Sequence, residues 1–233
     1  MIVEQIDVGN RLKNFTYVIS QGPDAWVIDP YDALQVVDYL DTNNLRLKMV
    51  INTHDHFDHV KGNDQLVKTT NCELYDYLNP ADIHIDSGLV LKPMLTPGHT
   101  MDHVAYRLQR NGEDKAFFSG DLLFHLSVGN CKNGGEVGVL FDSIEKVKSE
   151  ISPKAIFYPG HNYLNANHLF TESIYEQTLE LSEHVRFEDE LKYSIFLNTH
   201  DLEIREKISS LKKINFKSSK EFFIYLRSQR DIF

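Results

Sequence analysis

A short segment of this chain is crowded with side chains that bind metal ions. Residues 54–59 read His-Asp-His-Phe-Asp-His, and they follow an apolar run, Leu47–Asn52, that predicts a buried strand. Imidazole nitrogens and carboxylate oxygens are the usual ligands of zinc and similar divalent ions. A turn at the end of a strand can aim the first two histidines toward one point, while Asp58 and His59 reach a second point from the first turn of a helix. The segment therefore predicts a metal site at a strand end.

A metal site also needs ligands from other parts of the chain. Three candidates follow predicted strands, and each comes directly after a glycine: His99, Asp121 and His161. Glycine lets the backbone turn sharply close to an ion. A single His-x-His pair would indicate a solvated surface cluster, but its coincidence with three glycine-flanked ligands favours a metal centre. His103 is either a partner of a ligand or a strand histidine bonded to the backbone.

The first two thirds of the chain read as short apolar runs separated by turn residues, which is typical of strands. Asn111-Gly112 is a common hairpin turn, so the strands on either side of it are expected to pair. The predicted strands are Ile2–Val8, Phe15–Ser20, Ala25–Asp29, Leu47–Asn52, Leu89–Leu95, His103–Leu108, Lys115–Ser119 and Ala155–Tyr158.

Helices are predicted between these strands and after them. One follows Asp32, which can cap it, and the others are expected near Asp58–Val67, over Ser143–Ile151 and from Asn165 to about Val185. Most of the remaining tail is also expected to be helical. Strands that alternate with helices, followed by helices alone, indicate an α/β core and an α-rich end. We expect a catalytic domain over residues 1–165 and a helical substrate-side region over residues 166–233.

Composition narrows the possible partners. The formal net charge of −10 argues against a nucleic-acid partner, because an acidic surface repels phosphates. No apolar run approaches the ~20 residues that cross a bilayer, so no membrane partner is expected, and no signal peptide is recognisable. Cys72 and Cys131 form no CxxC pair and are expected to be reduced. A cytoplasmic protein is expected, and the oligomeric state is left open.

At this point the pattern resembles that of the metallo-β-lactamase superfamily: HxHxDH, followed later by a histidine, an aspartate and a histidine. The match spans about Ile2 to Tyr163. Within that superfamily the chain is most similar to glyoxalase II, the hydroxyacylglutathione hydrolases, because His161-Asn-Tyr163 with the downstream Asn167 and Phe170, and the tail over residues 222–233, resemble that family's segments. The resemblance implies an α/β fold, an αββα sandwich of two mixed sheets with a C-terminal α-helical region.

The resemblance also implies two divalent metal ions: zinc, with iron or manganese as alternatives. It gives one ion the ligands His54, His56 and His99, gives the other Asp58, His59 and His161, and makes Asp121 the bridge. Asp29 matches an acidic residue that ends an early strand in the superfamily, and it is expected to orient a ligand histidine. The alternative for Asp29 is a turn or capping residue before Pro30.

Catalysis and substrate binding follow from the same resemblance. A hydroxide shared by two ions would attack the substrate carbonyl, so no serine or cysteine nucleophile is needed. Asp121 and Asp58 would be catalytic, the latter also as a proton acceptor. Tyr163 and Lys132 match positions that contact glutathione. Two departures from the family, the segment Asn133–Glu136 and Asn198 in place of an arginine, remove groups that would bind anions.

The implied activity is hydrolysis of a small-molecule thioester, S-lactoylglutathione or a related S-(2-hydroxyacyl)glutathione, to a hydroxyacid and glutathione. This reaction belongs to methylglyoxal detoxification. Two alternatives keep the fold: a single-iron persulfide dioxygenase, which does not use the second set of ligands, and a lactonase. A non-catalytic metal-binding or redox-partner protein is a further alternative, although no ligand position has been lost.

Overall fold

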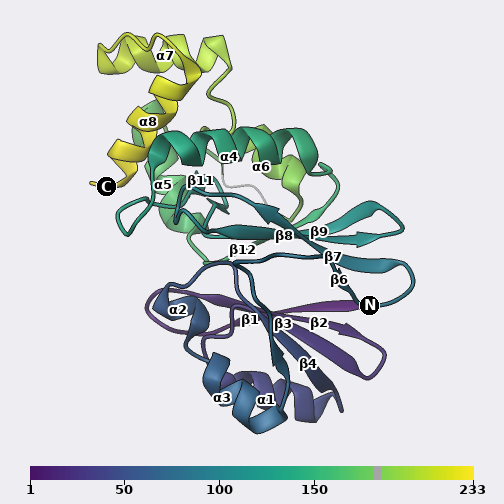
Figure 1. The fold of residues 1–233 in the computed structure, drawn as a ribbon. Helices are drawn as coiled ribbons and strands as arrows, with labels where there is room; N and C mark the ends of the chain where they lie inside the picture. The colour runs from purple at the N-terminus through teal and green to yellow at the C-terminus, as the bar shows by residue number, and fades with distance from the viewer. Residues whose placement is uncertain (181–184) are drawn as a thin grey trace.

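The computed structural model describes residues 1–180 and 185–233. Its centre is a pair of five-stranded sheets, which Figure 1 shows stacked with helices on the outside. The first sheet has the strand order β1 (Ile2–Asp7), β2 (Phe15–Gln21), β3 (Asp24–Ile28), β4 (Arg46–Ile51) and β5 (Glu73–Leu74). The second has the order β12 (Ile156–Pro159), β9 (Glu113–Gly120), β8 (Val104–Arg110), β7 (Leu89–Leu95) and β6 (Ile83–His84).

Both sheets mix parallel and antiparallel pairs. In the first, β1, β2 and β3 pair antiparallel, and β4 and β5 join in parallel. In the second, β12 lies parallel to β9, while the other pairs are antiparallel. As a result β7, β9 and β12 run in the same direction, and their carboxyl ends meet at one edge of the second sheet. The chain places one glycine-flanked candidate ligand after each of these three strands.

An apolar cluster fills the space between the two sheets. Ile19 from the first sheet and Tyr106 from the second are fully buried in it. The rings of Tyr17 and Phe118 lie 5.3 Å apart in the same cluster. Because successive side chains of a strand point to opposite faces, Val18 points the other way, into a second buried cluster under the helices. Strand β2 is therefore apolar on both faces.

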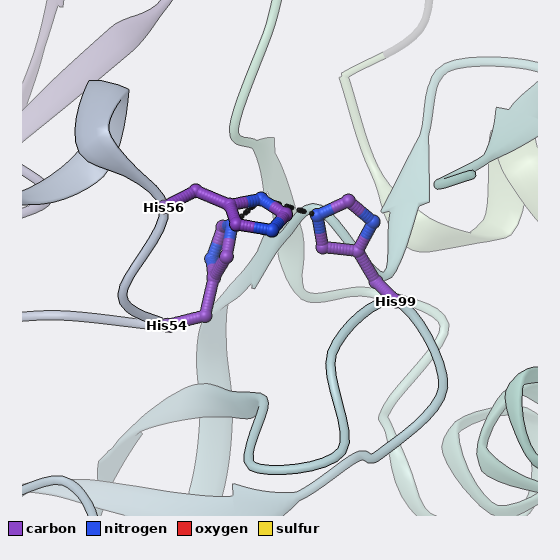
Figure 2. Close-up of side chains that lie close together, drawn as sticks. All are labelled: His54, His56 and His99. Atoms are coloured by element: carbon purple, nitrogen blue, oxygen red, sulfur yellow. Dashed lines mark hydrogen bonds between the residues drawn. The ribbon is translucent and has the colours of Figure 1, made fainter. Parts of the chain in front are cut away.

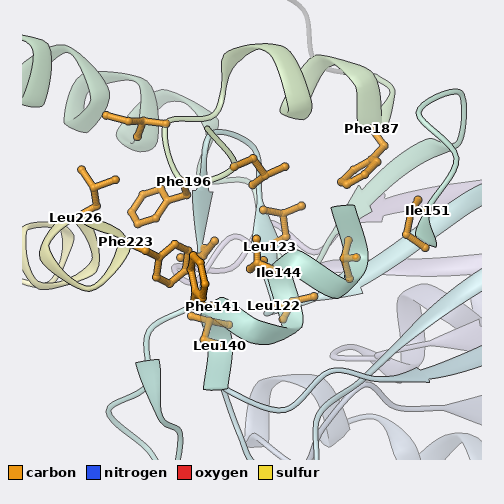
Figure 3. Close-up of a cluster of buried hydrophobic side chains, with 14 of the residues drawn as sticks. Leu122, Leu123, Leu140, Phe141, Ile144, Ile151, Phe187, Phe196, Phe223 and Leu226 are labelled. Carbon is orange, nitrogen blue, oxygen red and sulfur yellow. The ribbon is translucent and has the colours of Figure 1, made fainter. Parts of the chain in front are cut away.

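Helices cover the outer face of each sheet. On the first sheet, α1 (Ala33–Thr42) and α3 (Asn63–Thr70) bury Val36 and Leu66 against Val18 and Val50. On the second, α4 (Val137–Glu150), α5 (Leu164–Tyr175) and α6 (Phe187–Tyr193) form the outer layer, whose buried side chains Figure 3 shows. The predicted αββα sandwich is confirmed.

Two further helices complete the predicted C-terminal helical region. They are α7 (Leu202–Lys212) and α8 (Ser219–Arg230). Helix α8 returns to pack beside α4, where the rings of Phe223 and Phe141 lie 5.3 Å apart (Figures 1 and 3). Within the two described stretches, no helix has the length and apolar character needed to cross a membrane. The expected domain boundary at residue 165 stays a prediction.

Three predicted helices have different bounds in the structure. The helix expected over 58–67 is two helices, α2 (Phe57–Val60) and α3, because the Gly62 N–H leaves the helix to donate to the Pro30 carbonyl at 2.8 Å. The helix expected over 143–151 begins earlier, at the start of α4. The helix expected from 165 to 185 ends at Tyr175, where Glu176 takes a left-handed φ of 52°; residues 181–184 of that prediction lie outside the described residues.

Candidate metal centre

The predicted ligands leave the two sheets at neighbouring strand ends. His54 and His56 follow β4, and His59 lies in the one-turn helix α2. Asp58 lies in the same short helix, and the loops after β7, β9 and β12 carry His99, Asp121 and His161. The structure therefore brings together side chains up to 107 positions apart in sequence, since His54 and His161 lie in one cluster of rings.

Three imidazoles form the first half of the centre. The Nδ1 atom of His56 lies 3.0 Å from His54 Nε2 and 3.0 Å from His99 Nε2. Figure 2 shows His54 and His56 reaching from one loop toward His99 on another. These three nitrogen atoms are mutually close enough to bind a single ion.

The second half combines a carboxylate with two imidazoles. His59 Nε2 lies 3.3 Å from His161 Nε2. Asp58 Oδ2 lies 3.6 Å from His59 Nε2 and 3.5 Å from His161 Nε2. These three atoms are also close enough to bind one ion. Both histidines are buried, whereas the Asp58 side chain is 18% exposed and is therefore in contact with solvent.

Asp121 lies between the two halves. Its Oδ1 is 3.3 Å from His59 Nε2 and 3.2 Å from His161 Nε2, and its Oδ2 is 3.6 Å from His99 Nε2. The Oδ1 atom is buried and has no hydrogen-bond partner among the described residues. Gly160 explains how the carboxylate fits, because a Cβ atom at that position would collide with Asp121 Oδ1. One carboxylate therefore faces ligands of both groups.

The outward ring nitrogens fix the tautomers of the histidines. Nδ1 of His99 donates to the Asn130 carbonyl at 2.6 Å, and Nδ1 of His161 donates to the Leu12 carbonyl at 2.7 Å. Because a carbonyl oxygen can only accept, each Nδ1 must carry a proton, and in the neutral ring Nε2 then presents a lone pair. The His59 ring is fixed in the same way, with Nδ1 2.9 Å from Asp29 Oδ2.

Lone pairs therefore face one another inside the centre. His59 Nε2 and His161 Nε2 approach to 3.3 Å without a proton between them in these tautomers. Such an approach is repulsive unless a positive charge lies between the two atoms, and unprotonated nitrogens are what metal ions bind. The residues thus fit divalent cations by the chemistry of their donor atoms and by the orphaned oxygen of Asp121.

The charges of the centre also favour a bound cation. Burial by itself raises the pKa of Asp121, but the facing imidazoles of His161 and His59 outweigh burial and hold the pKa well below its ordinary value. For His59, burial lowers the pKa, while Asp121 and Asp29 raise it well above its ordinary value. Asp121 therefore stays ionised, and the space around it favours positive charge.

Asp29 supports the centre from behind. Its Oδ2 accepts hydrogen bonds from His59 Nδ1 at 2.9 Å and from Thr53 Oγ1 at 2.7 Å, and its Oδ1 accepts from the Thr53 N–H at 2.8 Å. Thr53 Oγ1 in turn lies 2.9 Å from His54 Nδ1. Since the hydroxyl donates to Asp29, it accepts from His54. The contact expected between Asp29 and a ligand histidine is present, and Thr53 extends it to a second one.

Two further residues position the ligands: Asn14, which was not predicted, and His103, for which a contact with a ligand was one of two alternatives. Asn14, in the loop before β2, donates its Nδ2–H to Asp58 Oδ2 at 2.9 Å and to the Asp58 carbonyl at 3.2 Å. His103 accepts from the Asp121 N–H at 3.2 Å and lies 2.9 Å from Thr96 Oγ1. Burial, with the nearby His99, lowers the pKa of His103 to about 3, so the ring is neutral and can accept.

A cavity of about 260 Å³ opens beside the second half of the centre. The ring of Tyr163 stacks on His161 at 4.8 Å and borders this cavity. Lys132 lies on the opposite rim, where its Nζ donates to the Asp231 carbonyl at 3.2 Å. Both residues expected to bind substrate therefore line one cavity next to the metal centre.

Two arginines that sequence reasoning missed line the same cavity. Arg230 donates from Nε to Asn167 Oδ1 at 3.1 Å, and the buried Arg227 donates from Nη1 to the Val128 carbonyl at 2.6 Å. The two arginines are three residues apart on α8, so they lie on the same face of that helix. This spacing can be read from the sequence. Asn198 lies elsewhere, capping the end of α6 by donating to the Leu191 and Ser194 carbonyls at 3.0 and 2.9 Å.

The segment Asn133–Glu136 also has a structural role. The Glu136 N–H donates to the Gly98 carbonyl at 2.8 Å. Gly135 packs so closely on the same loop that a Cβ atom would collide with the Gly98 and His99 carbonyl oxygens. This departure from the family therefore supports the loop that carries His99.

Comparison with known proteins agrees with the fold. The family model described as the metallo-beta-lactamase superfamily matches residues 11–77. Among solved structures, ETHE1 from Myxococcus xanthus superposes with a TM-score of 0.68 and 22% identity, covering 100% of this chain and 99% of that chain. TTHA1623 in a di-iron-bound form superposes with a TM-score of 0.61 and 23% identity, covering 83% and 100%. These solved structures share the fold of this chain.

Curated relatives identify the family of this chain. The hydroxyacylglutathione hydrolase of Nitrosococcus oceani is 31% identical, over 81% of this chain and 78% of that protein. The enzyme of the same name from Polaromonas sp. is 33% identical over 73% and 70%, and that from Francisella philomiragia is 30% identical over 100% of both. The chain belongs to the hydroxyacylglutathione hydrolases, a family of thioesterases.

Proposed function

We propose that this chain hydrolyses S-(2-hydroxyacyl)glutathione, with S-lactoylglutathione as the test substrate, and that it uses two divalent metal ions. The observation that carries the proposal is the convergence of histidine ring nitrogens and carboxylates on the space around Asp121. Family membership supports the thioester chemistry.

The proposed ligand sets follow the two groups of the centre. One ion takes His54, His56 and His99, the other takes Asp58, His59 and His161, and Asp121 contributes to both. Zinc is the first candidate. Iron and manganese accept the same mixture of imidazole and carboxylate donors, so availability can decide between them.

When bound, a pair of divalent ions lowers the pKa of a shared water toward neutrality and polarises a substrate carbonyl. The residues of the chain orient the ligands and provide a proton acceptor. Asp29 and the Leu12 and Asn130 carbonyls hold three ring protons on Nδ1, which leaves Nε2 as the atom that can bind an ion. Asp58 Oδ2 is oriented by Asn14, and because the side chain is partly exposed to solvent, it is placed to accept a proton.

The neighbouring cavity supports a glutathione carrier. Glutathione has two carboxylates and one ammonium group, so its site needs cationic and hydroxyl donors. The cavity offers the guanidinium of Arg230, the ammonium of Lys132 and the hydroxyl of Tyr163. The thiol part of the substrate would occupy this cavity, and the acyl part would face the metal centre.

A turnover assay tests the proposal. Zinc- or iron-loaded protein mixed with S-lactoylglutathione should remove the thioester absorbance, and His99→Asn should abolish this activity while the exposed control His84→Asn keeps it. Absence of turnover together with oxygen uptake on glutathione persulfide would replace the thioesterase by a persulfide dioxygenase. Turnover of a lactone alone would identify a lactonase, and inactivity on all three would leave a non-catalytic metal-binding protein.

Three further expectations belong to the same proposal. A cytoplasmic location is supported by Cys72 and Cys131, both of which are free thiols. We also keep the division into residues 1–165, which carry the metal ligands, and residues 166–233, which carry Arg227 and Arg230. The partner is proposed to be a small-molecule thioester, not a nucleic acid or a membrane.

A further inference from the structure

A fully buried carboxylate lies outside the metal centre and holds a turn beside the substrate cavity. Glu190 of α6 is 0% exposed. Among its contacts, Oε2 accepts from the Leu126 N–H at 2.8 Å and Oε1 lies 2.8 Å from His125 Nδ1. A buried carboxylate is costly unless its oxygens accept hydrogen bonds. The turn at His125 and Leu126 therefore stabilises the buried carboxylate of Glu190, and the carboxylate in turn restrains the turn.

The turn needs such support because its backbone is strained. His125 and Leu126 connect β10 (Leu123–Phe124) and β11 (Ser127–Val128) as a two-residue hairpin loop. Leu126 has a φ of 64°, the left-handed region that favours glycine or asparagine. A leucine persists in that conformation only if its surroundings impose it. The hydrogen bond from its N–H to Glu190 is one such restraint.

The same turn is joined to both sides of the substrate cavity. Asn167 donates from Nδ2 to the His125 carbonyl at 2.8 Å, and its Oδ1 accepts from Arg230 at 3.1 Å. On the other side, Phe124 packs its ring 5.7 Å from His161 and 5.2 Å from Tyr163. A shift of the turn would therefore move the partner of Arg230 and the ring that supports Tyr163.

We propose that Glu190 is a positioning residue: by holding the His125–Leu126 turn, it sets the arrangement of Arg230 and Tyr163 in the cavity that receives the thiol carrier. The proposal rests on the proposed function, because it takes that cavity to bind glutathione. Among the described residues Glu190 contacts no proposed metal ligand, and it is not one of the residues that line the cavity. It should therefore act on substrate affinity and leave the metal centre intact.

The test compares Glu190→Gln with Glu188→Gln, the same change at an exposed position two residues earlier on α6. The glutamine amide turns one acceptor into a donor that faces either the Leu126 N–H or His125. Loss of one hydrogen bond to a charged group should raise the Kd for glutathione and the KM for S-lactoylglutathione roughly tenfold. The kcat and the metal content should stay near those of the Glu188→Gln control.

A second variant separates positioning from folding. Leu126→Gly relieves the positive φ, so the double variant with Glu190→Gln should recover most of the glutathione affinity even if Glu190→Gln alone folds poorly. Unchanged Kd and KM in Glu190→Gln would overturn the proposal, and so would a double variant that shows no recovery or does not fold. Metal loss in parallel with kcat would also overturn it, by placing the effect in the metal centre.

A substrate-free measurement distinguishes failure of this inference from failure of the proposed function. Amide hydrogen exchange over residues 123–128 should be faster in Glu190→Gln and return toward the wild-type rate in the double variant. If the wild-type protein neither binds glutathione nor turns over its thioester, the proposed function fails, while the exchange rates still decide whether Glu190 holds the turn. Unchanged exchange in Glu190→Gln would refute that role.

Discussion

Asp29→Asn should weaken metal binding by roughly 10- to 100-fold, the usual effect of removing a partner that orients a metal ligand. Asparagine is one of the few residues that tolerate a left-handed backbone, so it can replace Asp29 at its φ of 51° without added backbone strain. The change therefore isolates the carboxylate. It removes one negative charge and replaces one acceptor oxygen by an NH₂ group.

The magnitude follows from the three hydrogen bonds that Asp29 accepts. The asparagine oxygen can occupy only one of the two acceptor positions, so its NH₂ group must face either the Thr53 N–H or His59 Nδ1. A hydrogen bond to a charged group contributes about 1.5–3 kcal/mol. Losing one is equivalent to about 10- to 150-fold in affinity, in agreement with the range for orienting residues.

The assay is a competition titration of zinc against a chromogenic chelator, with metal content measured after desalting. We expect the ion proposed at Asp58, His59 and His161 to be lost first, because Asp29 bonds directly to His59 and reaches His54 only through Thr53. Asp32→Asn is the matched control: it removes the same charge three residues later, and asparagine caps a helix as well as aspartate does. Two ions bound to Asp29→Asn at wild-type affinity would refute the reasoning.

Three further changes test the metal centre, the substrate cavity and the stability of the fold. Asp58→Ala should lower the metal content from two ions toward one by elemental analysis, and unchanged stoichiometry would remove it from the ligand set. Arg230→Gln should raise the KM for S-lactoylglutathione about tenfold with little change in kcat, whereas the exposed control Lys217→Gln should not; an equal KM in both would exclude a carrier contact. Asp114→Asn should destabilise the fold near neutral pH, and denaturant titrations should show this difference shrinking below the ordinary pKa of 3.8. Burial raises the pKa of Asp114, but hydrogen bonds from Arg107 and Gln109 outweigh it and lower the pKa, so its stabilisation is present above 3.8 and lost as the pH falls; a pH-independent difference would contradict this.

Local patterns in the sequence predicted the parts of the fold that local physics determines. The strand over Leu89–Leu95 has the predicted bounds, and Asp32 caps α1 through hydrogen bonds to the N–H groups of Leu34 and Gln35. The α2–α3 break was not predictable in this way. It depends on a hydrogen bond from Gly62 to the Pro30 carbonyl, on a segment 32 residues earlier.

The candidate site also combines residues that local sequence patterns indicate with residues that only long-range contacts identify. Glycine-flanked ligands after strands were recognisable because both the ligand type and the turn are local features. Asn14 was not, because its contact with Asp58 joins residues 44 positions apart, and an asparagine in a loop has many other uses. Arg230 was missed for a related reason: only the folded chain shows that α8 returns to the cavity beside Tyr163.

The most direct test of the metal centre is a crystal structure of the zinc-loaded protein with anomalous data at the zinc edge. We expect two peaks about 3.5–4 Å apart. One should be bound by His54, His56 and His99, the other by Asp58, His59 and His161, with Asp121 in contact with both. A single peak, or zinc bound outside these seven side chains, would contradict the account.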